Sequence, residues 1–167
     1  PDSKRYYPYS ELAANIIGFV NGENEGGVGL EAKYEATLEG TSGLTVTARN
    51  ARGTELLYQY EQYYDAENGQ NLVLTLDTNV QTALEAGMES MVTKFDAKNG
   101  GTGIVMDVNS GEILAMATKP DFNPNEPFAI TLQDELDEDI EKLKEQGEYS
   151  EEKEKELRSL ALQNQWR

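Results

Sequence analysis

The chain has 167 residues, of which 31 are acidic and 14 basic, so its formal net charge at neutral pH is -17. A field of this sign repels phosphate, which excludes nucleic acid and anionic lipid surfaces as expected partners. Cysteine and histidine are absent, which excludes disulfides, cysteine nucleophiles and catalytic triads that use histidine as the base.

The N-terminal part of the chain predicts two short helices joined by a glycine-rich loop. In "YSELAANIIGFV" the apolar side chains fall on one helical face, with Ser10 as the expected N-cap and Gly18 as the stop. In "LEAKYEATLEG" large apolar residues recur at every fourth position, and Gly40 ends the helix. Both helices are too short to be stable without tertiary contacts.

From Leu44 the hydrophobic period changes to two, which predicts a small antiparallel sheet. Residues 44–50 alternate apolar and polar side chains, and residues 51–60 read as a turn and a returning strand. After the turn "DAENGQ", residues 71–77 are expected to form a third strand.

The longest helix of this front portion is expected to begin after Asp77 or Thr78, either of which can cap it. A continuous apolar stripe then runs through Lys98, before Gly100 and Gly101 break the helix. The stripe consists of Val80, Leu84, Met88, Met91, Val92 and Phe95. We expect its methionines to fill the core.

The stretch "TGIVMDVNSGEILAMAT" predicts a β-hairpin in which Gly111 takes the left-handed position of the loop. The second strand is apolar on both faces, because Ile113 and Ala115 alternate with Leu114 and Met116. A strand of this kind requires cover on both sides, and the chain has few apolar residues left to supply it. We therefore expect the hairpin to open a larger buried sheet.

The last part of the chain, residues 131–167, predicts an acidic helical hairpin. A passage rich in proline precedes it, Gly147 interrupts it, and Ser150 starts a second helix that runs toward Trp166. The stretch "DELDEDIEK" lacks the turn glycine of an EF-hand, which argues against a tight calcium loop.

Three stretches carry a resemblance to a known family. "RYYPYSELAANIIGFV" resembles an Arg-x-Tyr-Pro motif, and "GGVGLEAKYEATLEGTSG" resembles a Gly-(Leu/Ile)-Glu-x-x-Tyr motif that ends in Leu-x-Gly. "GTGIVMDVNSGEILAMATKPDFNPN" resembles the first hairpin of a transpeptidase domain. In this order they resemble the front part of a class B penicillin-binding protein, over about Arg5 to Asn125. The sequence departs from the family pattern at Tyr9-Ser10 and at Glu35.

The resemblance implies an α+β fold in three parts. Residues 1–70 would belong to a non-catalytic pedestal or dimerisation module of short helices and a small antiparallel sheet. Residues 71–130 would begin a transpeptidase domain with a long helix and a hairpin, and residues 131–167 would be an acidic helical insertion. The motif residues expected to have structural or interface roles are Arg5, Tyr7, Pro8, Gly18, Gly29, Glu31, Tyr34, Gly40 and Gly43. Arg5 and Glu31 are expected either to form a structural ion pair or to be exposed to solvent.

The catalytic motifs of this family are Ser-x-x-Lys, Ser-x-Asn and Lys-(Thr/Ser)-Gly, and the last two do not occur in the chain. Ser-x-x-Lys occurs once, at Ser150 to Lys153, among glutamates that favour the protonated lysine. We expect Ser150 to cap a helix and not to act as a nucleophile. The ending "LALQNQWR" resembles the segment ahead of the nucleophile's helix, so the chain is expected to stop short of the active serine.

The expected function is therefore that of a non-catalytic front portion, which positions the transpeptidase domain of a longer protein for peptidoglycan cross-linking. By resemblance, that protein would bind penicillin, lie on the extracytoplasmic face of the bacterial membrane and be anchored by a helix upstream of Pro1. No cofactor is expected, and the expected partners are its own transpeptidase domain, a second copy, or proteins of division or elongation.

Two alternatives belong to other classes of protein. The chain could be a self-contained extracytoplasmic adaptor without an enzymatic role. A metal or nucleotide enzyme has no supporting motif, although binding of Mg²⁺ or Ca²⁺ by surface carboxylates alone stays open.

Overall fold

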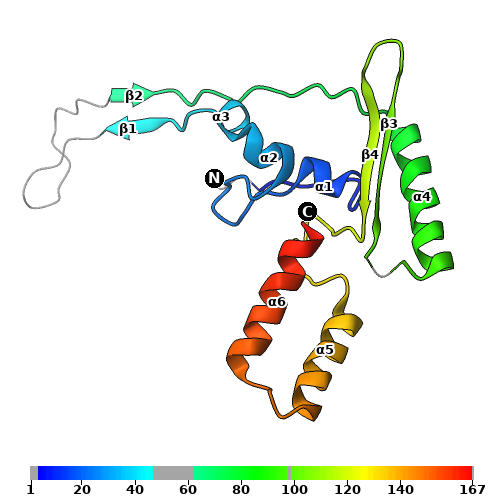
Figure 1. The fold of residues 1–167 in the computed structure, drawn as a ribbon. Helices are drawn as coiled ribbons and strands as arrows, with labels where there is room; N and C mark the ends of the chain where they lie inside the picture. Colours follow the sequence, from blue (N-terminus) through cyan, green and yellow to red (C-terminus); the bar gives the residue numbers. More distant parts are fainter. Residues whose placement is uncertain (1–3, 47–61, 98, 167) are drawn as a thin grey trace, which may run out of the picture. The chain divides into compact units, whose positions relative to one another are not determined.

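The structure is a computed structural model that describes residues 4–46, 62–97 and 99–166 (Figure 1). Its contacts divide the chain into two compact units, one made of Pro1–Lys33 with Leu74–Arg167 and the other of Tyr34–Val73. Helices of very different lengths and two small antiparallel sheets make up the described elements, which confirms the expected α+β class. The elements are α1 (Ala14–Ile17), α2 (Gly29–Lys33), α3 (Glu35–Leu38), β1 (Leu44–Val46), β2 (Gln62–Tyr64), α4 (Thr78–Phe95), β3 (Gly101–Met106), β4 (Ile113–Lys119), α5 (Gln133–Glu145) and α6 (Glu151–Gln165).

The first helix is shorter than the sequence predicts. Turns occupy the chain from Pro8 to Ala13, and Ser10 and Ala13 both have a left-handed backbone, with φ of 50° and 56°. The prediction that Ser10 caps the helix is wrong, since the N-cap is Ala13 and no side chain of the helix caps it. The turns bring Ala13 and Ala14 into the core, which a continuous helix from Ser10 would place differently. Gly18 ends the helix as expected.

The second predicted helix is divided into α2 and α3. Tyr34 separates them with φ of -112° and ψ of 20°, outside the helical region. In the unit 34–73, α3 is followed by the antiparallel pair β1–β2, in which Leu44 lies opposite Tyr64. The strand predicted from residues 51–60, and the end of the one predicted from 44–50, lie outside the described residues.

The prediction of a third strand at residues 71–77 is wrong. The segment is extended but forms only single bonds, from the Asp77 amide to the Leu114 carbonyl (2.8 Å) and from the Thr75 hydroxyl to the Ile113 carbonyl (2.7 Å). It leads directly into α4, so the chain turns away before a ladder of bonds can form.

Helix α4 begins as the sequence predicts. The Asp77 carboxylate accepts from the amides of Asn79 (2.8 Å) and Val80 (3.0 Å), which are free donors of the first turn. The helix ends at Phe95 and not at Lys98, because Asp96 adopts a left-handed conformation with φ of 48°.

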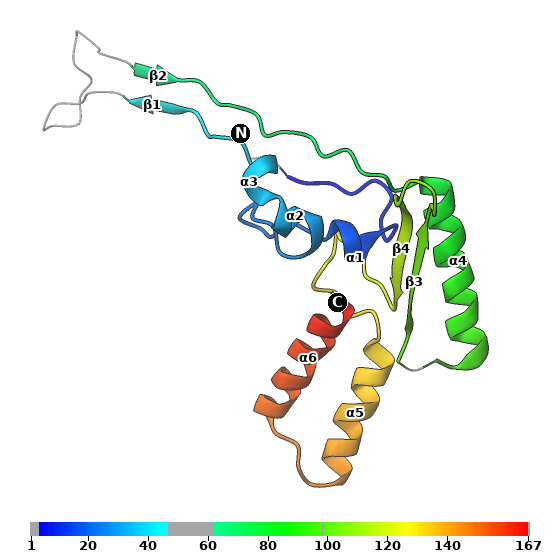
Figure 2. The same cartoon turned by 45° about the horizontal axis from the view of Figure 1, so that its top comes forward.

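The hairpin of β3 and β4 packs one of its faces on α4 (Figures 1 and 2). Gly103 lies opposite Ala117, and a Cβ at Gly103 would come within 2.9 Å of the Leu84 side chain on α4. On the other face of β3, Ile104 and Met106 are 57% and 51% exposed. Gly111 has φ of 79° in the hairpin loop, as predicted.

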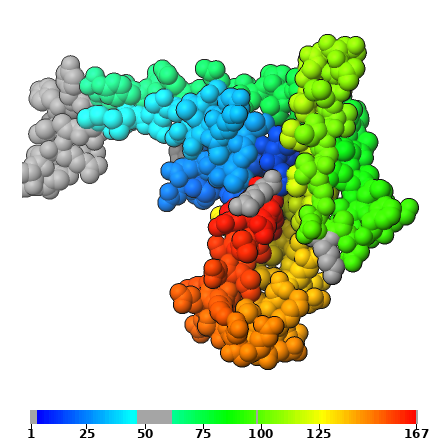
Figure 3. All heavy atoms as spheres, in the orientation of Figure 1, coloured from blue at the N-terminus to red at the C-terminus, as the bar shows by residue number. Residues whose placement is uncertain are grey.

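The acidic helices α5 and α6 form the predicted hairpin and lie side by side (Figures 1 and 3). Leu136 and Ile140 are its buried residues on α5. At its base, the Gln165 side chain donates to the carbonyls of Pro127 (3.2 Å) and Ala129 (2.9 Å) and accepts from the amide of Thr131 (3.0 Å). These bonds join the end of α6 to the chain that enters α5.

The core of the larger unit is aromatic. Phe19 and Phe122 are almost fully buried, and their rings meet edge to face at 5.9 Å. Trp166 packs on Phe19 at 5.2 Å, so the N-terminal segment, the proline-rich passage and the end of α6 share one cluster.

Candidate functional site

The N-terminal segment carries an ion pair between Arg5 and Glu31. The Arg5 guanidinium donates to both carboxylate oxygens, from Nε at 2.7 Å and from Nη2 at 3.1 Å. The Glu31 side chain is 8% exposed and that of Arg5 is 48% exposed. The hydrogen bond to Glu31 raises the pKa of Arg5, so the guanidinium is charged at all ordinary pH values. Of the two arrangements that the sequence left open, the structure has the ion pair.

Tyr7 lies beside this pair in the core. Its hydroxyl donates a long hydrogen bond of 3.5 Å to the Glu31 carboxylate. Burial, together with the charge of Glu31, raises the pKa of Tyr7 to about 12. The phenol therefore stays protonated and acts as a donor, not as a base.

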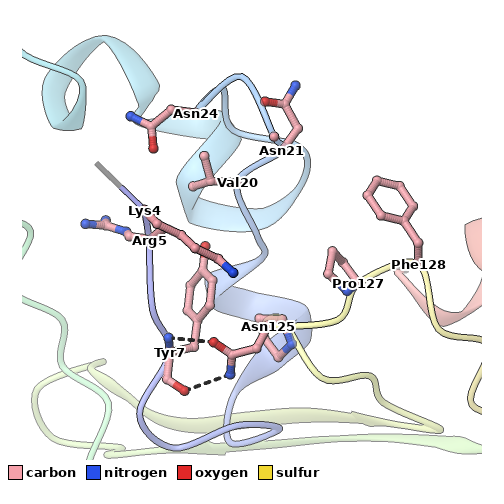
Figure 4. Close-up of a pocket in the computed structure, with 11 residues that line it drawn as sticks. Lys4, Arg5, Tyr7, Val20, Asn21, Asn24, Asn125, Pro127 and Phe128 are labelled. Atoms are coloured by element: carbon pink, nitrogen blue, oxygen red, sulfur yellow. Dashed lines mark hydrogen bonds between the residues drawn. The ribbon is translucent and has the colours of Figure 1, made fainter. Parts of the chain in front are cut away.

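The Tyr7 backbone is held by a residue 118 positions away in the sequence, Asn125. The Tyr7 amide donates to Asn125 Oδ1 (3.0 Å), and Asn125 Nδ2 donates to the Tyr7 carbonyl (2.9 Å), as the dashed lines of Figure 4 show. A side-chain amide that satisfies both backbone groups of one residue imitates a neighbouring strand. It joins the N-terminal segment to the passage that follows β4.

A pocket of about 370 Å³ opens beside these groups (Figure 4). Its lining comes from the N-terminal segment, the loop after Val20 and the passage from Pro124 to Phe128. Arg5 is already neutralised by Glu31, which leaves the exposed Lys4 as the other cation of the lining. In the part of the chain that the structure describes, no group of three acidic side chains is arranged to hold a metal ion.

Gly18 and Gly29 bring two backbone segments into direct contact. Both have a left-handed conformation, with φ of 80° and 66°. A Cβ at Gly18 would lie 1.9 Å from the Val28 carbonyl oxygen, and one at Gly29 would lie 2.5 Å from the Ile16 carbonyl oxygen. Only glycine fits either position, so these residues fix how α1 meets α2.

The remaining motif residues are distributed over both units. Pro8 lies in the turns before α1 and lines an apolar groove, while Tyr34 stands between α2 and α3. Gly40 and Gly43 lie in the 34–73 unit, where their backbones closely approach Glu67 and Tyr64. The structure thus brings together Arg5, Tyr7 and Glu31, and Gly18 with Gly29; it does not gather all nine predicted residues at one point.

The Ser-x-x-Lys match has the geometry of a helix cap. Ser150 Oγ accepts from the Lys153 amide at 3.2 Å, and the Lys153 ammonium lies 2.9 Å from the Glu148 carboxylate. The lysine is therefore paired with a glutamate and is not placed to take a proton from the serine.

Replacing Ser150 with alanine should cost about 1 kcal/mol of helix stability, because an N-cap acceptor is lost. We expect a small loss of helical signal in circular dichroism on heating. The same substitution at Ser159, inside α6, keeps the cap and serves as the control. An equal effect of the two substitutions would contradict the cap.

Three residues in the contacts of this region were missed by the sequence reasoning: Gln81, Glu85 and Asn125. Gln81 and Glu85 lie four residues apart beside the apolar stripe of α4, where a polar pair is itself a signal for a buried contact. Asn125 closes the stretch "KPDFNPN", which carried the resemblance but was not interpreted residue by residue.

Comparison with known protein families finds a match for the first part of the chain. Residues 1–74 match the family described as the Penicillin-binding Protein dimerisation domain. The match covers just under half of the chain. The matched residues include the Arg5–Glu31 pair and both contact glycines, and the resemblance to penicillin-binding proteins is confirmed.

Similarity continues beyond the dimerisation domain. The chain is 32% identical over 123 residues to stage V sporulation protein D of Bacillus subtilis and 32% identical over 124 residues to the peptidoglycan D,D-transpeptidase FtsI of Escherichia coli. Each match covers 74% of this chain but only 19% and 21% of the relatives, so the chain spans about a fifth of their length. A solved peptidoglycan synthetase from Bifidobacterium adolescentis superposes with a TM-score of 0.61 at 30% identity, over 72% of this chain and 22% of that one.

Proposed function

We propose that the chain is the non-catalytic front portion of a longer penicillin-binding protein, which we call the parent. In this proposal it positions the transpeptidase domain of the parent for peptidoglycan cross-linking. Relatives named D,D-transpeptidases support an enzymatic parent. The observation that carries the proposal is that the hairpin of β3 and β4 is covered by α4 on one face only.

The two outer edges of this hairpin differ. Along β4, the Leu114 carbonyl accepts from the Asp77 amide, and both backbone groups of Met116 bond to the Gln81 side chain. Ile104 lies opposite Met116, so its amide and carbonyl point outward along β3. Among the described residues no further strand pairs with β3. The sheet can therefore be extended on the β3 side and not on the β4 side.

The apolar side chains exposed on one face of β3 also support an extension of the sheet beyond this strand. Ile104 and Met106 would be covered if helices and strands of a transpeptidase domain packed there. We propose that residues 71–130 begin that domain, that residues 1–70 belong to the pedestal and that residues 131–167 are an acidic insertion. The nine motif residues would then stabilise the pedestal, chiefly through the Arg5–Glu31 pair.

The parent would form an acyl-serine intermediate with stem peptides and would bind penicillin covalently. It would lie on the extracytoplasmic face of the membrane, with an anchor upstream of Pro1. Among the helices that the structure describes, none combines the length and the hydrophobicity of a membrane span. The family name of residues 1–74 supports self-association, and proteins of division or elongation are further proposed partners.

Labelling with a fluorescent penicillin tests the proposal. We expect the parent to be labelled at a serine outside residues 1–167 and this chain to stay unlabelled, because it lacks the activating lysine. Labelling of Ser150 in this chain, or no labelling of the parent, would contradict the proposal.

Amide hydrogen exchange separates the proposal from the adaptor alternative. The amides of Thr102 and Ile104 on the outer edge of β3 should exchange rapidly in this chain and slowly in the parent. Slow exchange of both amides in a monomeric form of this chain would favour the self-contained adaptor.

A further inference from the structure

The side chain of Gln81 binds β4 as a neighbouring strand would. Its Nε2 donates to the Met116 carbonyl (2.7 Å), and its Oε1 accepts from the Met116 amide (2.9 Å). Gln81 is 1% exposed, so water does not compete for these bonds. One side chain of α4 therefore satisfies both outward backbone groups at the middle of β4.

Glu85 lies one helical turn further along α4 and extends this contact to the N-terminal segment. Its Oε1 accepts from Gln81 Nε2 (2.6 Å) and also from the backbone amide of Ala13 (2.8 Å). Ala13 is buried, has a left-handed backbone and begins α1 without a side-chain cap of its own. The carboxylate of α4 thus supplies the acceptor that the turn before α1 lacks.

These bonds form one unbroken path from α1 to the hairpin. The Ala13 amide bonds to Glu85, Glu85 to Gln81, and Gln81 to Met116. Each member holds the next in position, since a carboxylate oxygen shared by two donors fixes the orientation of the Gln81 amide.

We propose that Gln81 and Glu85 act as a clasp that transmits the position of α1 to strand β4. The clasp makes the N-terminal segment and the first hairpin move as one body. One part of this inference rests on the proposed function, namely that β4 belongs to the sheet of a transpeptidase domain. The mechanical coupling itself is a property of this chain and can be tested without the parent.

A coupled clasp has a signature that separate local contacts lack. No hydrogen bond joins Glu85 to the Met116 backbone, and none joins Gln81 to the Ala13 amide. If the two residues work together, removal of either must loosen the amide that only the other one contacts.

The experiment measures exchange of individual amides by NMR in the 167-residue chain. In Glu85→Ala we expect the Ala13 amide to exchange faster and the Met116 amide to exchange faster as well, each by roughly tenfold. In Gln81→Leu we expect the same two amides to respond. The amides of α5 and α6 should keep their rates, which shows that the variants stay folded.

Two further variants complete the test. Glu89→Ala removes the same charge one turn along α4. It breaks the pair of Glu89 with Lys119 at the end of β4 (3.5 Å), but Lys119 keeps its pair with Asp121 and every bond of the clasp is kept, so both amides should exchange as in the unaltered chain. Glu85→Gln keeps an oxygen acceptor and should restore most of the protection of Ala13 and Met116. If each variant affects only the amide that its own residue contacts, or if Glu89→Ala has the same effect as Glu85→Ala, the clasp is refuted. Neither result depends on whether the parent binds penicillin.

Discussion

Alanine in place of Gly18 is expected to destabilise the larger unit by roughly 3–5 kcal/mol, the sum of a left-handed backbone penalty and overpacking. Gly18 has φ of 80°, a conformation that alanine adopts only with strain. Its new Cβ would also stand 1.9 Å from the Val28 carbonyl oxygen, which is backbone and cannot rotate away. Because α1 and α2 meet at this point, we expect the N-terminal segment to lose its contact with the core.

Chemical denaturation followed by circular dichroism measures this loss. Gly22→Ala is the matched control, since Gly22 has no positive φ and no atom within 4 Å of its Cβ position. We expect the control to change the stability by no more than about 0.5 kcal/mol. If the Gly18 variant unfolds at the same denaturant concentration as the control, the close contact is not present in solution.

Arg5→Ala is the second substitution for which we expect a large effect. It should lower the free energy of unfolding by about 2–4 kcal/mol, because it leaves a buried carboxylate without its cation. Glu31 is 8% exposed, and the long hydrogen bond from the Tyr7 hydroxyl would be its remaining side-chain contact. Glu31→Gln should cost less, because the Arg5 side chain is half-exposed and water can solvate it.

The same unfolding experiment separates the two partners. The double variant Arg5→Ala with Glu31→Gln should be more stable than Arg5→Ala alone, since no buried charge is left. The control is Arg158→Ala, which removes a partly exposed ion pair with Glu154 within α6 and should lower the free energy of unfolding by less than about 0.5 kcal/mol. If Arg5→Ala lowers the free energy of unfolding no more than Arg158→Ala does, the Arg5–Glu31 pair is not buried in solution.

Family assignment depended little on three-dimensional structure. The motifs around Arg5, Glu31 and the hairpin loop identified the relationship that the family match over residues 1–74 and the relatives matched over about 124 residues confirm. The division into three parts and the roles of the nine motif residues stay predictions. The contacts of the molecule instead separate residues 34–73 from the rest.

Errors in the fold prediction share one cause. The first helix was predicted from Ser10 because its periodicity is correct, but the chain forms turns up to Ala13. The Ala13 amide at the end of these turns is bound by Glu85, which lies 72 residues away. Residues 71–77 alternate like a strand, yet their bonds go singly to Ile113 and Leu114 and form no ladder.

By itself the sequence determined the features that depend on neighbours within a few residues: the caps at Asp77 and Ser150, the left-handed Gly111 and the helical hairpin at the C-terminal end. Only the tertiary structure decided where α1 begins, that Asn125 holds Tyr7, and which edge of the hairpin stays open. The physical reason is that caps and turns are satisfied by local donors and acceptors. A buried carboxylate or amide such as Glu85 or Gln81 is satisfied by backbone groups far away in the sequence, which a local pattern does not specify.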